Sequence, residues 1–463
     1  MFYEGFDIDP AAGTTDPLLA YFKSAGPIFG GGLTNFEFLS EKPIIIPLDL
    51  NEWVRFDKPG KYRITVWSGR VSDMTIGDKD YGAPARIKSN TIELQILAPD
   101  PAWQQAQLRE ILAELGGPPS ARWVAMPEPT SIAMRRLRYL GTADAARELA
   151  LRISDEQSGI STPCAFGLIG SPNRMAGLEE LKKLLVDPDF PVGVNFLITL
   201  SVLPLDPAES AEDLQKQREA NVKAAQSALV DALANKRGKA LDESLETAMR
   251  WADPSAASDL KSKFVVKLIE SFDQLPVEKQ VDWIGENWPK VKDPRWLPTL
   301  RAIAARYTDF APPHNGEEAN YPLRLTGTAL MRWYELDPEG ARGTVIAEII
   351  RPKPRYGANI LGLLPDKTLP AQQQAIASHF VSAPDYETEG YLASLLDRYA
   401  DAAVLPVVLP KIKRKIQHQQ WECVPETYSL SYVEKVDPHT GKLLRDQLKD
   451  SPCLKDSSIN QAP

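Results

Sequence analysis

Two neighbouring apolar stripes joined by the dipeptide Asp337-Pro338 constrain the fold of this chain more than any other feature. On each side of the dipeptide, in residues 321–336 and 338–350, apolar side chains recur with the period of an α-helix. Aspartate is a favoured N-cap and proline is tolerated at the first helical position, so the dipeptide predicts the start of a second helix. Two short helices cannot fully cover each other's apolar faces. The pair therefore predicts a stack of similar helical pairs.

The same dipeptide recurs along the chain. Asp253, Asp293 and Asp337 are each followed by proline and are separated by 40 and 44 residues. This spacing is typical of HEAT and armadillo repeats. Earlier Asp-Pro turns do not keep the period. We therefore expect residues 131–416 to form a HEAT-like α-solenoid, and an irregular all-α bundle is the alternative.

Residues 1–99 follow a different period. Apolar and polar side chains alternate over residues 44–50, 61–66 and 91–96, which predicts strands with one face on a core and one in water. The turn at residues 57–60 (Asp-Lys-Pro-Gly), with the strand after it, resembles the Pro-Gly-x-Tyr motif of immunoglobulin-like extracellular modules. We expect an antiparallel β-sandwich of this immunoglobulin-like kind. A complete one has about seven strands, so the domain is expected to be either truncated at its start or small.

Other segments lie between and after these parts. Residues 100–130 are expected to form a connecting helix and a linker, because Asp100-Pro101 precedes an apolar stripe that includes Trp103. An apolar helix over residues 192–203 is expected after Asp187-Pro188. Residues 417–463 are polar without a clear stripe, which predicts an irregular C-terminal tail. Just before this tail a basic cluster predicts either the solvated face of a last helix or a patch for an anionic partner, and it comprises Lys411, Lys413, Arg414 and Lys415.

The formal net charge of -9 argues against broad binding to nucleic acid or to an anionic membrane, because both need a basic surface. No apolar run approaches the ~20 residues of a membrane span. The N-terminus, Met1-Phe2-Tyr3-Glu4, has no signal-peptide pattern. The compartment is therefore left unassigned, and an extracytoplasmic location stays open if Met1 is not the natural start.

Reactive residue types form no recognisable catalytic, cofactor-binding or metal-binding pattern. The cysteines are far apart, and Cys164 has no neighbour that would activate it as a nucleophile. Asp78 and Asp80 suggest a calcium loop, but the twelfth position is Ser89 where glutamate is needed. We therefore expect a non-enzyme without cofactors. No i, i+4 pair and no His-Glu-x-x-His motif is present among the histidines, which are His314, His379, His418 and His439.

Tryptophans are concentrated in the central repeats. Because tryptophan fills large gaps between stacked helices, one interpretation places them in the core. Tryptophan is also a favoured anchor in protein interfaces, so the other interpretation is a concave surface that binds a protein or peptide partner. The candidate partner-binding residues are Trp251, Trp283, Trp288, Trp296 and Trp333.

On two stretches the chain resembles uncharacterised bacterial HEAT-repeat proteins that have an N-terminal β-sandwich domain. These stretches are the strand region at residues 48–56 and the repeat turn Leu336-Asp337-Pro338-Glu339-Gly340. The resemblance implies the two-part architecture but no activity. Related proteins of this type are often exported, and this N-terminus neither shows nor excludes export.

These observations favour a non-enzymatic protein–protein interaction scaffold built on α-helical repeats. One alternative is the non-catalytic C-terminal portion of a larger hydrolase of the zinc aminopeptidase type, whose His-Glu-x-x-His motif would precede Met1. The other is a carbohydrate-binding β-sandwich, in which Trp53 and Trp67 would stack on sugar rings. The partner, the oligomeric state and the binding face are not predicted.

Overall fold

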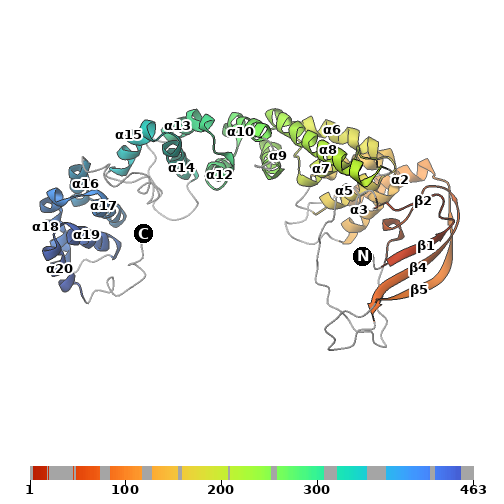
Figure 1. Cartoon of the computed structure of the whole chain (residues 1–463), viewed down its shortest axis with the longest axis horizontal. Coiled ribbons are helices and arrows are strands. Elements are labelled where there is room, and N and C mark those ends of the chain that lie inside the picture. Colours follow the sequence, from red (N-terminus) through yellow and green to blue (C-terminus); the bar gives the residue numbers. More distant parts are fainter. Residues whose placement is uncertain are drawn as a thin grey trace. The chain divides into compact units, whose positions relative to one another are not determined.

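The computed structural model describes residues 4–17, 19, 45, 48–72, 84–116, 128–154, 159–206, 209–251, 258–306, 321–351, 372–417 and 423–449. The described chain is mostly helical, with a small antiparallel sheet near its N-terminus (Figure 1). It divides into two compact units, Met1–Glu270 and Ser271–Pro463. The sheet and the first helices share one of these units.

The sheet has three antiparallel strands in the order β1 (Glu4–Asp9), β4 (Gly60–Ser72) and β5 (Pro84–Ile96). The strands predicted at residues 61–66 and 91–96 are therefore confirmed. On β4 the predicted alternation places Tyr62 and Ile64 in the core, whereas on β5 Ile92 is about half exposed.

A separate two-stranded pairing joins β2 (Thr14–Thr15) to β3 (Arg55–Phe56). These described strands do not confirm an immunoglobulin-like sandwich. The strand predicted at residues 44–50 is wrong where the structure describes it, because Leu48 and Asp49 lie outside any strand and a 3-10 helix, η1 (Leu50–Glu52), follows. Local backbone hydrogen bonds, such as Glu52 N–H to Asp49 O at 2.9 Å, replace a strand ladder there.

Helices of the first unit pack in two alternating layers. α3 contacts α5 and α5 contacts α7 in one layer, while α4 contacts α6 and α6 contacts α8 in the other. Consecutive helices also contact each other, so the arrangement is compatible with an α-solenoid. The helices are α2 (Pro101–Leu115), α3 (Glu128–Leu140), α4 (Ala143–Arg152), α5 (Ser161–Gly170), α6 (Arg174–Val186), α7 (Val194–Val202), α8 (Ala211–Ala232), α9 (Gly238–Trp251) and α10 (Ser258–Ser271), with η2 (Leu233–Asn235) after α8.

Capping explains why α2 begins where the sequence predicts. The Asp100 carboxylate accepts hydrogen bonds from the backbone N–H groups of Ala102 and Trp103, and Pro101 is the first helical residue. The dipeptide Asp187-Pro188 behaves differently, because Asp187 ends α6 and α7 begins only at Val194.

A buried lysine holds the turn that follows α6. The Lys236 ammonium donates hydrogen bonds to the backbone carbonyls of Leu184, Asp187 and Phe190 at 3.3, 2.6 and 2.6 Å, and the residue is 2% exposed. Burial lowers the pKa of this ammonium to about 8, although the negative charge of Asp187 opposes the shift. The hydrogen bonds of the Lys236 ammonium therefore join the turn after α6 to the residues before α9.

The second unit repeats the layered packing. α17 contacts α19 in one layer, and α18 contacts both α16 and α20 in the other. Earlier in the unit α14 contacts α11, α13 and α15. The elements are η3 (Phe272–Gln274), α11 (Val277–Ile284), α12 (Trp288–Val291), η4 (Pro294–Trp296), α13 (Leu297–Arg306), α14 (Tyr321–Leu336), α15 (Pro338–Ile349), α16 (Gln373–Val381), α17 (Tyr386–Tyr399), η7 (Ala402–Val404), α18 (Leu405–Gln417), α19 (Cys423–Val436) and α20 (Pro438–Gln447).

The hairpin predicted from Asp337-Pro338 is present as α14 and α15. The Asp337 carboxylate caps α15 by accepting from Gly340 N–H at 3.0 Å. Asp293 starts η4 in the same way, through Arg295 N–H at 2.8 Å. The third dipeptide of the proposed period, Asp253-Pro254, lies outside the described residues, as do the Asp78–Gly82 loop and residues 450–463.

The irregular tail predicted for residues 417–463 is wrong over α19 and α20. Asp437-Pro438 carries the same helix-start signal as the earlier dipeptides, and the Asp437 carboxylate accepts from Thr440 N–H at 3.1 Å. Leu430, Val433 and Leu444 from these two helices are buried. The stripe was missed because it is short and interrupted by polar residues that face solvent.

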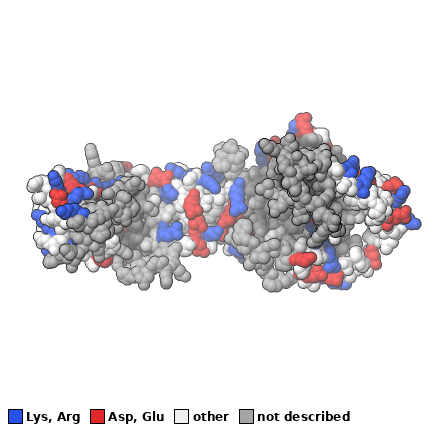
Figure 2. Space-filling model, turned by 90° about the horizontal axis from the view of Figure 1, so that it is seen from below, with Lys and Arg blue, Asp and Glu red and all other residues white. Residues whose placement is uncertain are grey.

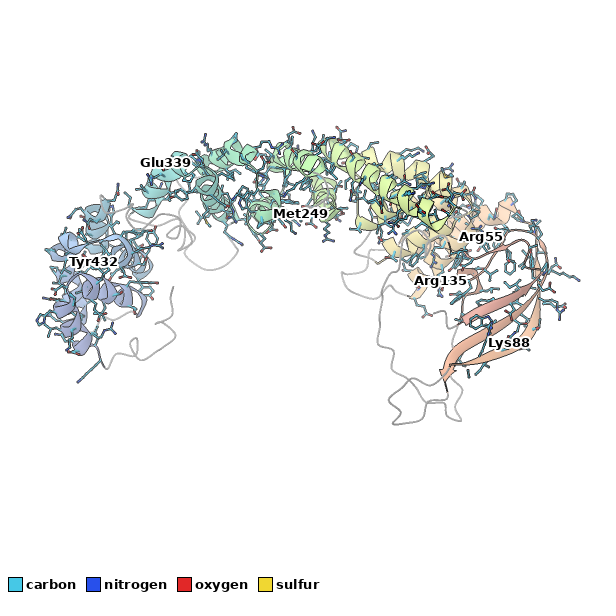
Figure 3. The ribbon with its side chains drawn as sticks, viewed as in Figure 1. Arg55, Lys88, Arg135, Met249, Glu339 and Tyr432 are labelled. Carbon is cyan, nitrogen blue, oxygen red and sulfur yellow. The ribbon has the colours of Figure 1, made fainter. Side chains whose placement is uncertain are left out.

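These helices close a continuous apolar core, which we call the C-terminal core. Its residues include Phe380, Leu396, Val408, Val433 and Leu444. Tyr432 lies among the same helices (Figure 3), and its hydroxyl donates to the Asp401 carbonyl at 2.6 Å.

One buried carboxylate sits at the edge of the C-terminal core. The Glu389 oxygens pair with the ammonium groups of Lys411 and Lys415 at 3.0 and 2.6 Å, and the Glu389 side chain is 7% exposed. Lys411 also donates to the Phe380 carbonyl at 2.7 Å and lies 4.9 Å from the centre of that ring. The carboxylate and the two ammonium groups thus tie α17 to α18.

Candidate functional site

A groove of about 690 Å³ lies in the first unit between α2, α3 and η1. Trp103 on α2 is 56% exposed and Ile132 on α3 is 40% exposed, although large apolar side chains are usually buried. Both side chains line the groove, together with Asp49, Leu50, Asn51, Gln104, Gln107, Ile111, Arg135, Arg136, Tyr139 and Leu140. The groove therefore offers an apolar anchor point beside polar groups.

Arginines of α3 hold the walls of the groove in place. The Arg136 guanidinium pairs with Glu110 at 2.8 Å and Glu114 at 3.0 Å and donates to the Gln107 amide oxygen at 2.9 Å, which joins α3 to α2. Arg135, labelled in Figure 3, pairs with Asp49 just before η1. Two arginines and one aspartate are the charged residues that line the groove, and both arginines are already paired with carboxylates.

A smaller and more enclosed cavity of about 220 Å³ adjoins the groove. Asn51 and Tyr139 line both spaces. The rest of the cavity wall comes from residues in or next to β2, β3, α3 and α5. These residues are Pro17, Val54, Arg55, Phe56, Arg138, Gly141, Phe166, Gly167, Gly170 and Pro172. We call this contact region of strands and helices the junction.

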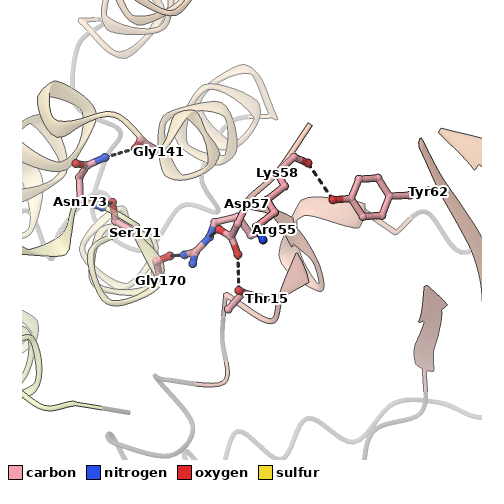
Figure 4. Close-up of polar contacts among 9 residues, drawn as sticks. All are labelled: Thr15, Arg55, Asp57, Lys58, Tyr62, Gly141, Gly170, Ser171 and Asn173. Atoms are coloured by element: carbon pink, nitrogen blue, oxygen red, sulfur yellow. Dashed lines mark hydrogen bonds and ion pairs between the residues drawn. The ribbon is translucent and has the colours of Figure 1, made fainter. Parts of the chain in front are cut away.

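Polar contacts fix the junction (Figure 4). Arg55 donates to the Gly170 carbonyl at the end of α5 at 2.6 Å and pairs with Asp57 at 2.7 Å. The Thr15 hydroxyl donates to the other Asp57 oxygen. Burial raises the pKa of Asp57, but the hydrogen bonds from Thr15 and Arg55 outweigh it and hold this pKa below its usual range. Asp57 therefore stays ionised and orients Arg55 towards α5.

The Asn173 side chain supports the helical side of the junction. Its amide donates to the Gly141 carbonyl at 2.6 Å (Figure 4). Gly141 has a φ of +69°, a conformation that L-residues rarely adopt. This backbone turn brings the end of α3 against Pro172, which is the nearest neighbour of a Cβ atom placed on Gly141.

The structure places three of the five candidate tryptophans in the core of the second unit. Trp283, Trp288 and Trp296 are at most 2% exposed. Trp288 donates to the Glu335 carboxylate at 2.9 Å and Trp296 to the Val291 carbonyl at 2.9 Å, so even their polar N–H groups are satisfied internally.

The two other candidate tryptophans, Trp333 and Trp251, do not define an exposed partner-binding surface in the described residues. Trp333 is partly buried and packs against the C-terminal core. The side chain of Trp251 lies outside the described residues. These positions favour the core interpretation. In the described part of the first unit Trp103, which the sequence assigned to an apolar helix face, is exposed instead.

The tryptophans suggested for sugar stacking are both partly buried. The Arg86 guanidinium lies 4.1 Å from the centre of the Trp67 ring, and Gly5 is so close to the indole that an added Cβ would lie 2.2 Å from it. Trp53 lies 5.7 Å from the Phe6 ring. Protein groups thus already contact both rings.

Other candidate residues are dispersed. In the basic cluster, Lys411 and Lys415 turn inwards to Glu389, while Lys413 and Arg414 are exposed. His379 is partly buried and His439 is exposed, on different helices, and His314 and His418 lie outside the described residues. Figure 2 shows cations and anions interspersed over the described parts of the face that it displays, without a patch of one sign.

Cys164 is a fully buried thiol on α5. Within the described ranges, no group of three or more His, Cys, Asp or Glu side chains is placed to hold a metal ion. In the same ranges no helix has both the length and the apolar composition that crossing a bilayer requires. Comparison with known protein families, curated proteins and solved structures found no match to this chain.

The residues that distinguish the groove and the junction were not found from the sequence. Trp103, Arg138 and Tyr139 come from two helices whose mutual packing has no local signal. A weak signal exists in the Arg135-Arg136-Leu137-Arg138 run, which puts three cations on one short helix. Only the packing of α2, η1 and β3 against that helix gives them separate roles.

Proposed function

We propose that this chain is a non-enzymatic protein–protein interaction scaffold, built on HEAT-like helical repeats that follow a β domain of the immunoglobulin-like kind. The groove beside Trp103 is the observation that carries the proposal. Buried aromatic anchors dominate the energetics of protein interfaces, and here a tryptophan side chain is exposed before any partner binds. The two-layer packing of neighbouring helices supports the repeat architecture.

The partner proposed for the groove is a protein segment with one large apolar side chain flanked by acidic residues. The apolar side chain would pack on Trp103 and Ile132, which form the exposed apolar part of the lining. The acidic residues would face Arg135 and Arg136. Both arginines already have carboxylate partners, so these charges would contribute more to specificity than to affinity.

Selection from a displayed library of random peptides against the full chain tests this proposal. Enriched peptides should combine an apolar anchor with acidic neighbours and should lose at least tenfold in affinity against Trp103→Ala. The control is Tyr386→Ala, which removes a 41% exposed aromatic ring from the second unit and should leave binding unchanged. A selection without enrichment, or peptides that bind both variants equally, would contradict the groove as a partner site.

A further inference from the structure

Strand β5 forms one edge of the three-stranded sheet, and among the described residues β4 is the strand that pairs with it (Figure 1). Residues 85–93 of β5 are all exposed. They include two large apolar side chains, Ile87 with 51% and Ile92 with 47% of its surface exposed. An edge strand presents unpaired backbone N–H and C=O groups, so it is a template for pairing with another strand. This edge lines neither the groove nor the cavity of the junction.

A β-bulge determines which side chains of β5 share a face. Between two regular pairs with β4, Ser89 and Asn90 together lie opposite the single residue Val66, whose backbone N–H donates to Ser89 Oγ at 3.0 Å. The alternation of side chains between the two faces of the strand is therefore interrupted at this point. As a result Lys88, before the bulge, lies on the same face as Thr91, after it.

Contacts across the sheet identify this face as the polar one. The Lys88 ammonium pairs with the Asp7 carboxylate at 2.9 Å, and the Thr91 hydroxyl is hydrogen-bonded to the Thr65 hydroxyl at 2.7 Å. Asp7 and Thr65 lie opposite each other in β1 and β4. The polar face of β5 therefore carries, in chain order, Arg86, Lys88, Thr91 and Glu93.

The two ends of this polar row carry opposite charges. The Arg86 guanidinium lies 4.1 Å from the centre of the Trp67 ring. Since the ring contacts the flat side of the guanidinium, the N–H groups at its edge stay available to an acceptor. At the other end, Glu93 has no ion pair within the described residues. An antiparallel copy of β5 would bring the basic end of one strand opposite the acidic end of the other.

One-to-one pairing about a two-fold axis through the centre of the bulge matches both faces of the strand. It places Arg86 opposite Glu93 of the second copy and Ile87 opposite its Ile92, and the symmetry repeats each pair. The bulge makes this match possible, because in an uninterrupted strand Arg86 and Glu93 would point to opposite faces. Opposite charges and pairs of β-branched apolar side chains both stabilise neighbouring antiparallel strands.

We propose that this chain forms a symmetric dimer in which the β5 edges of two copies pair antiparallel, so that both three-stranded sheets become one. Charged side chains on an edge strand normally discourage pairing with other strands, and here their pattern suits a second copy of the same strand. The paired edge is smaller than a standard interface of roughly 1,600 Å², so the dimer is of the transient kind. This proposal does not depend on the partner proposed for the groove.

Sedimentation velocity of the full chain tests the proposal at protein concentrations from about 1 to 200 µM, where transient complexes dissociate. The protein should change reversibly from monomer to dimer as its concentration rises. Hydrogen exchange of the β5 amides should slow over the same range, whereas exchange in α18 of the second unit should stay constant.

Charge reversal separates self-pairing from a folding defect. Glu93→Lys places a cation opposite Arg86 twice, and Arg86→Glu places a carboxylate opposite Glu93 twice, so each variant alone should dimerise about tenfold more weakly. An equimolar mixture of the two variants restores both attractive pairs and should form a heterodimer that recovers most of the lost affinity. Glu339→Lys is the control, since this side chain of the second unit is 81% exposed, and it should dimerise like the wild type.

A chain that stays monomeric at all these concentrations would overturn the proposal. A dimer that neither variant weakens, or two variants that do not associate when mixed, would overturn it as well. If peptides selected against a monomeric chain lost their binding in both variants, the edge would belong to an extended segment of another protein, and self-pairing would be wrong.

Discussion

The junction of the first unit and the C-terminal core of the second are held together in different ways. The C-terminal core is a continuous set of apolar side chains from α14 to α20, and its buried hydroxyl and carboxylate have partners. The junction is fixed by arginines that bridge strands and helices, and it borders a cavity of about 220 Å³. The C-terminal helices thus match their apolar faces, whereas the contacts between strands and helices in the junction leave empty space.

The largest expected effect comes from deleting an aromatic ring in each region. Phe380→Ala should lower the free energy of unfolding of the second unit by about 3–5 kcal/mol, because the ring is 1% exposed in close-packed surroundings. Phe166→Ala should lower that of the first unit by only about 2 kcal/mol, because one side of the ring already faces a cavity. Hydrogen exchange read by mass spectrometry over α16–α20 and α3–α5 measures both. Equal losses of unfolding free energy in the two units would contradict the predicted difference between the junction and the C-terminal core.

Charge removal should also separate the two regions. Glu389→Gln leaves two ammonium groups without their carboxylate in a 7% exposed position, so the second unit should lose about 3 kcal/mol. Glu52→Gln in the junction should cost less than about 1 kcal/mol, because Glu52 is 37% exposed and 3.4 Å from Arg138. Urea denaturation of the full-length variants gives both values, and a larger loss for Glu52→Gln would reverse the ranking. Glu339→Gln is the control. The Glu339 side chain is 81% exposed, so this variant should not measurably change the free energy of unfolding.

Two buried cations of the first unit differ in the same way. The Lys236 ammonium has three carbonyl partners, whereas Arg138 Nε has no hydrogen-bond partner in the described chain. Lys236→Met should lower the free energy of unfolding by about 2 kcal/mol at pH 7, since the carbonyls lose their donor.

The same lysine predicts a pH dependence. Its pKa is about 8 in the folded unit and 10.5 in the unfolded chain. Between these two pH values the unfolded chain binds a proton that the folded unit has lost. The contribution of Lys236 to the free energy of unfolding therefore increases as pH rises from 8 to 10.5, and it is lost as pH falls back through 8. The difference between wild type and Lys236→Met, followed by urea denaturation at pH 7 to 10.5, should grow over this window. A constant difference would contradict the shift.

The smallest effects come from two tyrosine hydroxyls. Tyr432→Phe should cost about 1 kcal/mol, because its hydroxyl donates to the Asp401 carbonyl at 2.6 Å. Tyr139→Phe should change the free energy of unfolding by less than about 0.5 kcal/mol or raise it, because the removed hydroxyl makes no hydrogen bond of normal geometry in the described chain. Thermal unfolding of both variants checks the difference. A loss at Tyr139 as large as at Tyr432 would show that the nearby Glu52 carboxylate satisfies the hydroxyl.

Local sequence patterns were sufficient to predict helix starts and strands where one short segment determines its own structure. Asp100, Asp293 and Asp337 start helices or helical turns because each carboxylate caps N–H groups two or three residues away. Alternation along residues 61–66 and 91–96 identified β4 and β5 for the same local reason. The α19–α20 pair was missed although Asp437-Pro438 carries the same signal, because the polar composition of the tail outweighed a short stripe.

The candidate site required information that the local sequence does not contain. Trp103 lies on a predicted apolar face, yet it is 56% exposed although α2 packs against α3. Arg138 and Tyr139 are neighbours in sequence, yet both interact with Glu52, a residue of η1 that is 86 positions earlier than Arg138. Burial of Trp288 and Trp296 likewise depends on their packing against each other, with ring centres 6.3 Å apart.

The alternating layers described for each unit have a kinetic and evolutionary consequence. Most helix contacts join elements that are adjacent or next but one along the chain, so the helical parts are rich in local contacts and should form rapidly from many starting points. A gene segment that encodes one helical pair can also be duplicated or lost without redesign of distant contacts. The length of such a chain is therefore easier to change in evolution than the junction with its cavity.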